Sequence, residues 1–206
     1  RYRYAQQGEV GAWNFARLLE SISPLMEEPK SLYEVLDSYY DSYRGHSNRM
    51  WAEKLGLDGF QEGDGDLVTE LTSVMQLTET DMTILFRTLS TIQEPESNHL
   101  APAFYKEEEI PQNEWNTWLD RWWDRVDGRP DRESMLSANP KYVLRNWMAQ
   151  LAIDAAEKED YSVATQLHEM LKKPYEEQPG NEKKWFTRRP EWARNRVGCS
   201  MLSCSS

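Results

Sequence analysis

Two cysteines near the end of the sequence are the residues whose type and position best suit chemistry. Cys199 and Cys204 are the only cysteines among 206 residues, and Cys204 lies third from the last residue, Ser206. A thiol this close to a chain end, flanked by serines, is suited to reversible thiol–disulfide exchange. Two reduced cysteines without a function fit the same spacing equally well. We therefore treat Cys204 and Cys199 as candidate redox residues and leave both interpretations open.

Other reactive residue types form no recognisable catalytic or metal-binding motif. The acidic run Asp58–Asp66 departs from a calcium loop, because counting from Asp64 places Val68 at the fifth ligand position and Met75 at the twelfth. No glycine-rich phosphate loop of the dinucleotide or Walker type is present. The paired carboxylates lie in charged stretches and are interpreted as solvated faces; they are Glu157 with Asp160 and Glu176 with Glu177. Each histidine lacks a second His or Cys at metal-ligand spacing; the three are His46, His99 and His168. The sequence thus predicts no catalytic, cofactor-binding or metal-binding residue.

Four tryptophans gather in one segment at helical spacing: Trp115, Trp118, Trp122 and Trp123. Such a cluster could stack on a sugar or a base. Packing in a core, or docking on a neighbouring domain, is the favoured interpretation, because large aromatic side chains dominate cores and interfaces.

The composition excludes several classes of function. The chain has 24 Lys and Arg against 35 Asp and Glu, a net charge of −11, which disfavours binding to nucleic acid. No run of 18 apolar residues is present, so we expect no membrane-spanning helix. Nine Trp and ten Tyr argue against disorder.

The hydrophobic spacing predicts one helix after another and no strand, so the expected fold class is all-α. Ser31 with Glu34, and Thr78 with Asp81, have the spacing of capping boxes. Asn139 is expected to cap a helix that begins at Pro140. Helices are expected over residues 9–22, 31–43 (continuing through 49–55), 67–75, 82–92, 115–126, 140–158 and 162–171.

Composition also suggests a division of the chain. Residues 1–92 form a helical segment, and 93–113, with three prolines and the run Glu107–Glu109, form a connecting loop suited to insertion or mobility. Residues 114–172 form the C-terminal helices. Residues 173–206 form a polar, extended tail that ends with the terminal cysteine.

Motifs at both ends of the sequence resemble those of the selenoprotein O family. The ending Cys204-Ser205-Ser206 is similar to the family's end, where selenocysteine or cysteine lies third from the carboxy terminus. The other matching blocks are Arg1-Tyr2-Arg3-Tyr4 with Gln7 and Trp13-Asn14, Asn139-Pro140-Lys141-Tyr142-Val143-Leu144-Arg145-Asn146-Trp147 with Ala155-Ala156-Glu157, Pro174-Tyr175, and Pro190-Glu191-Trp192. The resemblance spans the chain and is weakest between Leu55 and Trp115.

The resemblance implies a protein adenylyltransferase with a kinase-like (pseudokinase) fold. Such proteins bind ATP with Mg²⁺ and transfer AMP to Ser, Thr or Tyr hydroxyls of protein substrates. The residues of that reaction lie upstream of the point that Arg1 matches, so the resemblance implies that this chain is the helical C-terminal part of the enzyme. It also implies that the partners are the upstream kinase-like lobes and the protein substrates. A bacterial cytoplasm is the expected location, with a mitochondrion as the alternative.

One departure from the family concerns the thiol pair. Family members often have cysteine three residues before the selenocysteine position, where this sequence has Met201. A pair of Cys199 with Cys204, and a partner for Cys204 elsewhere in a longer chain, both stay open.

Two alternative functions come from other classes. A stand-alone helical interaction module would bind a partner through the face from Trp115 to Trp123. A thiol-redox module would act through Cys204, and it requires that this thiol be alkylated faster than a model thiol.

Overall fold

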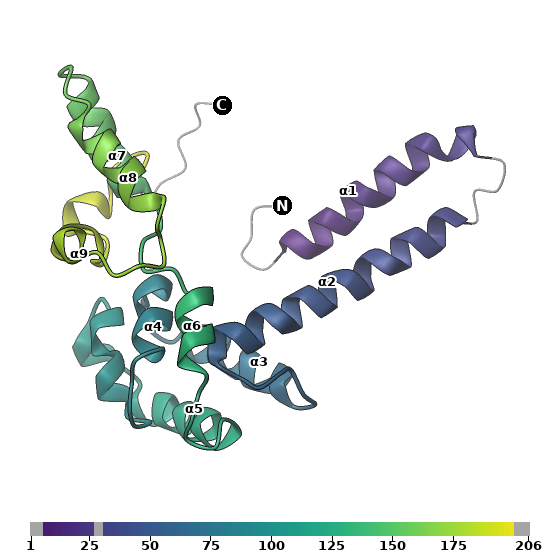
Figure 1. The fold of residues 1–206 in the computed structure, drawn as a ribbon, viewed down its shortest axis with the longest axis horizontal. Coiled ribbons are helices and arrows are strands. Elements are labelled where there is room, and N and C mark those ends of the chain that lie inside the picture. Colours follow the sequence, from purple (N-terminus) through teal and green to yellow (C-terminus); the bar gives the residue numbers. More distant parts are fainter. Residues whose placement is uncertain (1–5, 27–30, 200–206) are drawn as a thin grey trace. The chain divides into compact units, whose positions relative to one another are not determined.

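The computed structural model describes residues 6–26 and 31–199, shown as a ribbon in Figure 1. Helices are the regular structure of these residues, which contain no β-strand; an isolated bridge joins Thr80 and Phe104. The predicted all-α class is therefore confirmed. No described helix combines the length and hydrophobicity needed to cross a membrane.

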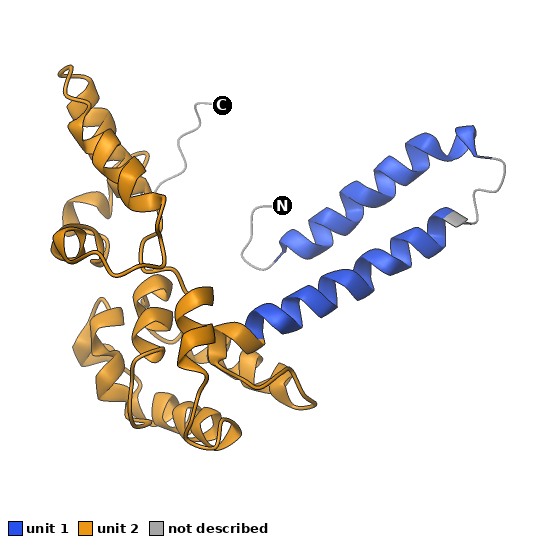
Figure 2. Ribbon diagram, in the orientation of Figure 1, with its two compact units in different colours: residues 1–51 blue, residues 52–206 orange. Residues whose placement is uncertain are grey.

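The chain divides into two compact units, Arg1–Trp51 and Ala52–Ser206, coloured separately in Figure 2. The first unit contains α1 (Gln7–Ile22), a short 3₁₀ helix (Ser23–Leu25) and most of α2 (Ser31–Leu55). The two stretches expected around Gly45 form one continuous helix, α2. The Ser31 side chain lies outside the described residues, so the capping box of Ser31 and Glu34 stays a prediction.

In the first unit α1 and α2 pack against each other through glycine and tyrosine. The Tyr39 hydroxyl donates a hydrogen bond to the Gly8 carbonyl at 3.0 Å, and the Tyr39 and Phe15 rings lie 5.8 Å apart. A Cβ atom at Gly8 would lie 2.5 Å from Tyr43 Cζ, so a larger residue there would require the Tyr43 ring to move. Glycine at position 8 therefore allows this ring to lie directly against the α1 backbone.

Little of the apolar surface of α1 is buried. Its buried residues are Gly8, Ala12 and Leu19, whereas Trp13 is 56% and Leu18 is 55% exposed. Trp13 and Leu18 are therefore not part of the buried face of α1. They lie off the narrow face, at positions 8, 12 and 19, that meets α2.

In the second unit, a first helical core is built around α5 (Gln112–Arg125). Trp118 Nε1 donates to the Leu67 carbonyl and Trp122 Nε1 to the Leu55 carbonyl, each at 2.9 Å. These bonds satisfy two buried indole donors and fix α5 against α3 and the end of α2. The other elements of this part are α3 (Asp64–Val74), α4 (Met82–Leu89), two 3₁₀ helices (Ser97–Ala103 and Glu107–Glu109) and α6 (Arg132–Ala138).

The segment expected as a connecting loop, 93–113, contains these two 3₁₀ helices. Its residues Leu100, Ala103 and Phe104 are fully buried, and the Phe104 ring lies 5.4 Å from that of Trp115. The sequence-based expectation of loop conformation is thus corrected, because apolar residues between the prolines pack on α4 and α5.

A second apolar cluster joins α7 (Asn146–Ala156), α8 (Ser162–Leu171), α9 (Pro179–Trp185) and a 3₁₀ turn (Glu191–Ala193). Its buried members are Tyr142, Trp147, Met148, Leu167, Met170, Trp185, Ala193 and Cys199. The described part of the expected extended tail therefore contains a helix and supplies core residues. The prediction of an extended tail was wrong because Trp185 is buried in the core even though most of its neighbours in the tail are polar.

One predicted cap and one predicted helix start are wrong, although α4 begins at Met82 as expected. The cap of α4 is Asp81, whose Oδ1 accepts from the Ile84 amide at 3.1 Å; it is not Thr78. Helix α7 begins at Asn146, not at Pro140. In the stretch between α6 and α7, the amides of Lys141 and Tyr142 donate to the Pro174 carbonyl at 2.8 and 3.0 Å, which holds the backbone away from a helical path.

Candidate functional site

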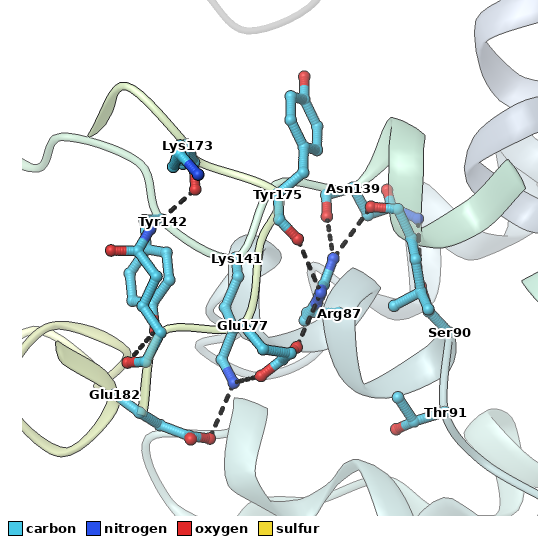
Figure 3. Close-up of polar contacts among 12 residues, drawn as sticks. Arg87, Ser90, Thr91, Asn139, Lys141, Tyr142, Lys173, Tyr175, Glu177 and Glu182 are labelled. Carbon is cyan, nitrogen blue, oxygen red and sulfur yellow. Dashed lines mark hydrogen bonds and ion pairs between the residues drawn. The ribbon is translucent and has the colours of Figure 1, made fainter. Parts of the chain in front are cut away.

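The segment between α6 and α7 carries the longest matched motif and is the centre of a polar cluster, shown in Figure 3, whose Arg87 and Lys141 side chains are buried and whose carboxylates are partly exposed. Asn139 is fully buried. Its Oδ1 accepts from Lys54 Nζ at 2.8 Å, and its Nδ2 donates to the Lys54 carbonyl at 2.9 Å. Burial lowers the pKa of Lys54. Asn139 therefore links α6 to the end of α2.

Arg87, on α4, binds three backbone carbonyls in two separate stretches of the chain. Its Nη1 donates to the Leu136 and Asn139 carbonyls, and its Nη2 to the Tyr175 carbonyl, all at 3.0 Å. Nη2 also donates to Glu177 Oε1 at 2.8 Å. Figure 3 shows the guanidinium lying between these acceptors. A nearly buried guanidinium whose Nη atoms meet four acceptors fixes the positions of the segments around it.

Lys141 completes the cluster on the side of α9. Its ammonium group donates to Glu177 Oε2 and, at 2.9 Å, to Glu182 Oε1. Burial opposes the charge of Lys141, but the two carboxylates outweigh burial and raise the pKa of the ammonium group. Hydrogen bonds from Lys141 and Arg87 lower the pKa of Glu177. Glu177 is therefore ionised and shared by two cations.

The end of the same segment connects α4 with the C-terminal residues. Arg145 forms a two-pronged ion pair with Asp81, the cap of α4, and its Nη1 also donates to the Thr187 carbonyl at 3.1 Å. The Tyr142 hydroxyl donates to the Gln178 carbonyl at 3.1 Å. Through these contacts residues 139–145 join α4, the α8–α9 connection and the residues after α9.

The cluster is built to position helices. Arg87, Lys141 and Arg145 each donate to carbonyls or carboxylates of the chain itself, as given above. Cations engaged in this way are not free to bind the phosphates of a nucleotide. The arrangement therefore indicates a structural role for the motif.

Of the two candidate redox residues, only Cys199 lies within the residues that the structure describes. Cys199 is reduced and buried in the α7–α8–α9 cluster. Cys204 lies outside the described residues, so its partner and its role stay predictions.

The tryptophan cluster is core. Trp115, Trp118 and Trp122 are at most 2% exposed, and the Trp118 and Trp122 rings stack 6.0 Å apart. Core packing is thus the correct interpretation of these three residues. A partner-binding face from Trp115 to Trp123 would have to rely on Trp123, which is partly exposed, because the chain itself covers the other three rings.

The acidic loop and the histidines have local partners or face solvent. Arg125 Nε donates to Asp64 Oδ1 at 2.8 Å and its Nη1 to Asp58 Oδ1 at 2.9 Å, so these carboxylates hold an arginine. His168 is exposed on α8, and His46 Nδ1 lies 2.7 Å from the Ser42 carbonyl oxygen.

One exposed group has a metal-type donor set. Ligand atoms of Glu94, Glu96 and His99 lie within 4.8 Å of one another. The adjoining hollow, of about 360 Å³, is lined by polar and acidic residues such as Asn116 and Asp120 and by no lysine or arginine. A donor set without a cation beside it does not fit the triphosphate of a Mg²⁺–ATP complex.

Comparison with known proteins shows the family. Residues 1–172 match the family model described as "Protein adenylyltransferase SelO". The chain belongs to this SelO family. Proteins named "Protein nucleotidyltransferase YdiU" align with the whole chain: 46% identical in Flavobacterium johnsoniae, 41% in Rhodopirellula baltica and 40% in Aromatoleum aromaticum.

The chain spans about two fifths of the length of these SelO-family relatives. The aligned share is 42% of the Flavobacterium johnsoniae and Rhodopirellula baltica proteins and 41% of the Aromatoleum aromaticum protein. More than half of each relative therefore has no counterpart in this SelO-family chain.

Three members of the polar cluster were missed from the sequence. Glu177 was interpreted as part of a solvated face, yet it binds Arg87 and Lys141. Arg87 and Glu182 carried no signal at all, because the partners of Arg87 lie 49 or more residues away and the partner of Glu182 lies 41 residues away. Only the matched motif around Asn139 and Lys141 pointed to this region of the SelO-family chain.

Proposed function

We propose that this chain is the C-terminal part of a protein adenylyltransferase with a kinase-like fold. The observation that carries the proposal is the family match over residues 1–172 together with relatives more than twice as long. The polar cluster supports it, because its cations are engaged in holding helices together. The catalytic centre is then supplied by the part of the protein that precedes this chain.

The proposed reaction is the transfer of AMP to a protein hydroxyl. A Ser, Thr or Tyr oxygen attacks the α-phosphorus of ATP, the bond to the β-phosphate oxygen breaks, pyrophosphate leaves, and the hydroxyl proton passes to a carboxylate. In this proposal ATP and Mg²⁺ bind in the part of the protein that precedes this chain, as the family resemblance implies. The bacterial relatives favour a cytoplasmic location.

Within that protein the first unit is proposed to pack against the catalytic part. Its α1–α2 pair leaves large apolar side chains exposed, among them Trp13, Leu18 and Tyr33 at 72%. A hollow of about 280 Å³ between the two helices is lined mainly by apolar atoms. Surfaces of this kind mark interaction sites.

The test compares two proteins, this chain and the longer reading frame that contains it. Each is incubated with ATP labelled on the α-phosphate, Mg²⁺ and a mixture of bacterial proteins. We expect label to enter proteins only with the longer protein. Transfer by this chain alone, at a rate similar to that of the longer protein, would contradict the proposal.

A further inference from the structure

Residues 187–199, which we call the C-terminal strap, are held to the second unit mainly by polar contacts. Ala193 and Cys199 are its only buried side chains, whereas Trp192 is 44% and Val197 is 63% exposed. Releasing the strap therefore exposes little apolar surface. Segments with small apolar burial and half-exposed polar contacts open more easily than a core.

The middle of the strap is fastened mainly at one carboxylate, and the Arg188 side chain and the Arg189 amide add bonds to the Phe104 carbonyl and the Tyr105 hydroxyl. Arg189 Nη2 lies 2.6 Å from Glu79 Oε1, and Arg194 Nη1 lies 2.9 Å from Glu79 Oε2. Both guanidinium groups also lie over the Tyr105 ring, at 5.4 and 5.7 Å from its centre. The Glu79 side chain is 40% exposed, so this fastening is open to water and to salt.

The end of the strap is fastened on α7. Arg196 Nη2 donates to Asp154 Oδ1 at 2.7 Å, and the Cys199 amide donates to the Arg196 carbonyl at 3.1 Å. Gly198 has φ of +85°, and a Cβ there would lie 3.2 Å from Gln150 Oε1. The chain thus runs close to α7 and turns the Cys199 side chain into the apolar cluster.

We propose that the C-terminal strap can detach reversibly and thereby controls access to the thiol of its own residue Cys199. When docked, it keeps this thiol buried against α7. When it detaches from Glu79 and Asp154, it exposes the thiol to small thiol-reactive molecules while α7, α8 and α9 stay folded. This inference concerns access to one side chain and goes beyond the proposed adenylyl transfer.

The test measures alkylation of Cys199 by iodoacetamide in the whole chain. The thiolate sulfur bonds to the reagent's carbon, iodide leaves and the thiol proton goes to solvent. Fragmentation of the C-terminal peptide in a tandem mass spectrometer assigns the label to Cys199 or to Cys204. Glu79→Gln removes the anchor of two arginines without touching Cys199, so we expect alkylation of Cys199 to become roughly fivefold faster or more.

The control is Glu169→Gln, which breaks an exposed pair with Lys172 on α8 and should leave the rate unchanged. In the unmodified chain, 1 M salt should accelerate alkylation in the same sense as Glu79→Gln, because it screens both anchors. Equal rates for Glu79→Gln and the unmodified chain would overturn the proposal. So would loss of helix in Glu79→Gln measured by circular dichroism, or a Cys199 in the unmodified chain as reactive as a model thiol.

Discussion

At the scale of single residues, Asn139 shows how much one buried amide can connect. Replacing it with Ala leaves the Lys54 carbonyl and ammonium group without this partner inside the protein. We expect Asn139→Ala to lower the free energy of unfolding by about 2 kcal/mol. Urea denaturation followed by circular dichroism measures this. Asn113→Ala, at an exposed position of α5, is the matched control and should change stability by less than about 0.5 kcal/mol. Equal effects of the two substitutions would contradict the role given to Asn139.

Glu177 gives the cluster a dependence on pH. Its pKa is lowered in the folded chain by Lys141 and Arg87. The stabilisation is therefore complete above the unfolded pKa, near 4.5, and is lost as the pH falls through the lower folded value. We expect the unmodified chain to be more stable than Glu177→Gln at about pH 5. This difference in the free energy of unfolding should shrink as the pH falls to about 3. The carboxylate is largely exposed, so the effect should be about 1 kcal/mol or less. Urea midpoints at several pH values measure it, and a constant difference would contradict the assignment.

At the scale of elements, α9 is anchored in the apolar core by one side chain. Trp185 is 1% exposed and its ring stacks on Trp147, with centroids 5.9 Å apart. Trp185→Ala should cost about 3 to 5 kcal/mol, because it removes a large buried side chain and leaves a cavity. Trp192→Ala, whose ring is 44% exposed, should cost about 1 kcal/mol or less. Thermal or urea denaturation compares the two, and similar losses would show that α9 is not anchored in this way.

The elements also show what the sequence could and could not predict. Spacing of apolar residues was sufficient for the existence of α1, α2, α5 and α8, because each has a repeating apolar face. It failed at Asn139-Pro140, a strong helix-start signal, because the Asn139 amide is used by Lys54 and the following amides by Pro174. It failed for the tail because one tryptophan at position 185 outweighs many polar neighbours. Contacts between residues far apart in sequence decided both cases.

The candidate site was predictable only as a motif. Residues Asn139 to Trp147 marked the region through their resemblance to a family, but neither Arg87 nor Glu182 shares a local pattern with them. Charged partners 41 or more residues apart leave no periodic trace in one sequence. The function of the cluster, which is to hold helices in place, therefore emerged only from the hydrogen bonds.

At the scale of the whole molecule, the two units should differ in local stability. The first has a narrow buried face, and the second has a core of stacked tryptophans. We expect the amides of α1 to exchange with deuterium at least tenfold faster than those of α5 in this chain. They should become protected in the longer protein, where the proposed catalytic part covers α1. Mass spectrometry of peptides from both helices measures this, and equal protection in this chain would contradict the difference in local stability.

The two stacked tryptophan pairs give the second unit its own optical labels. Trp118 and Trp122 lie together on α5, while Trp147 and Trp185 meet from α7 and α9. Emission from a buried indole shifts to longer wavelength when water reaches it. In a variant whose other five tryptophans are phenylalanine, replacing either pair as well would leave the other pair as a natural reporter. Loosening around α5 and loosening around α9 could then be recorded as separate spectra, without attaching a dye to the protein.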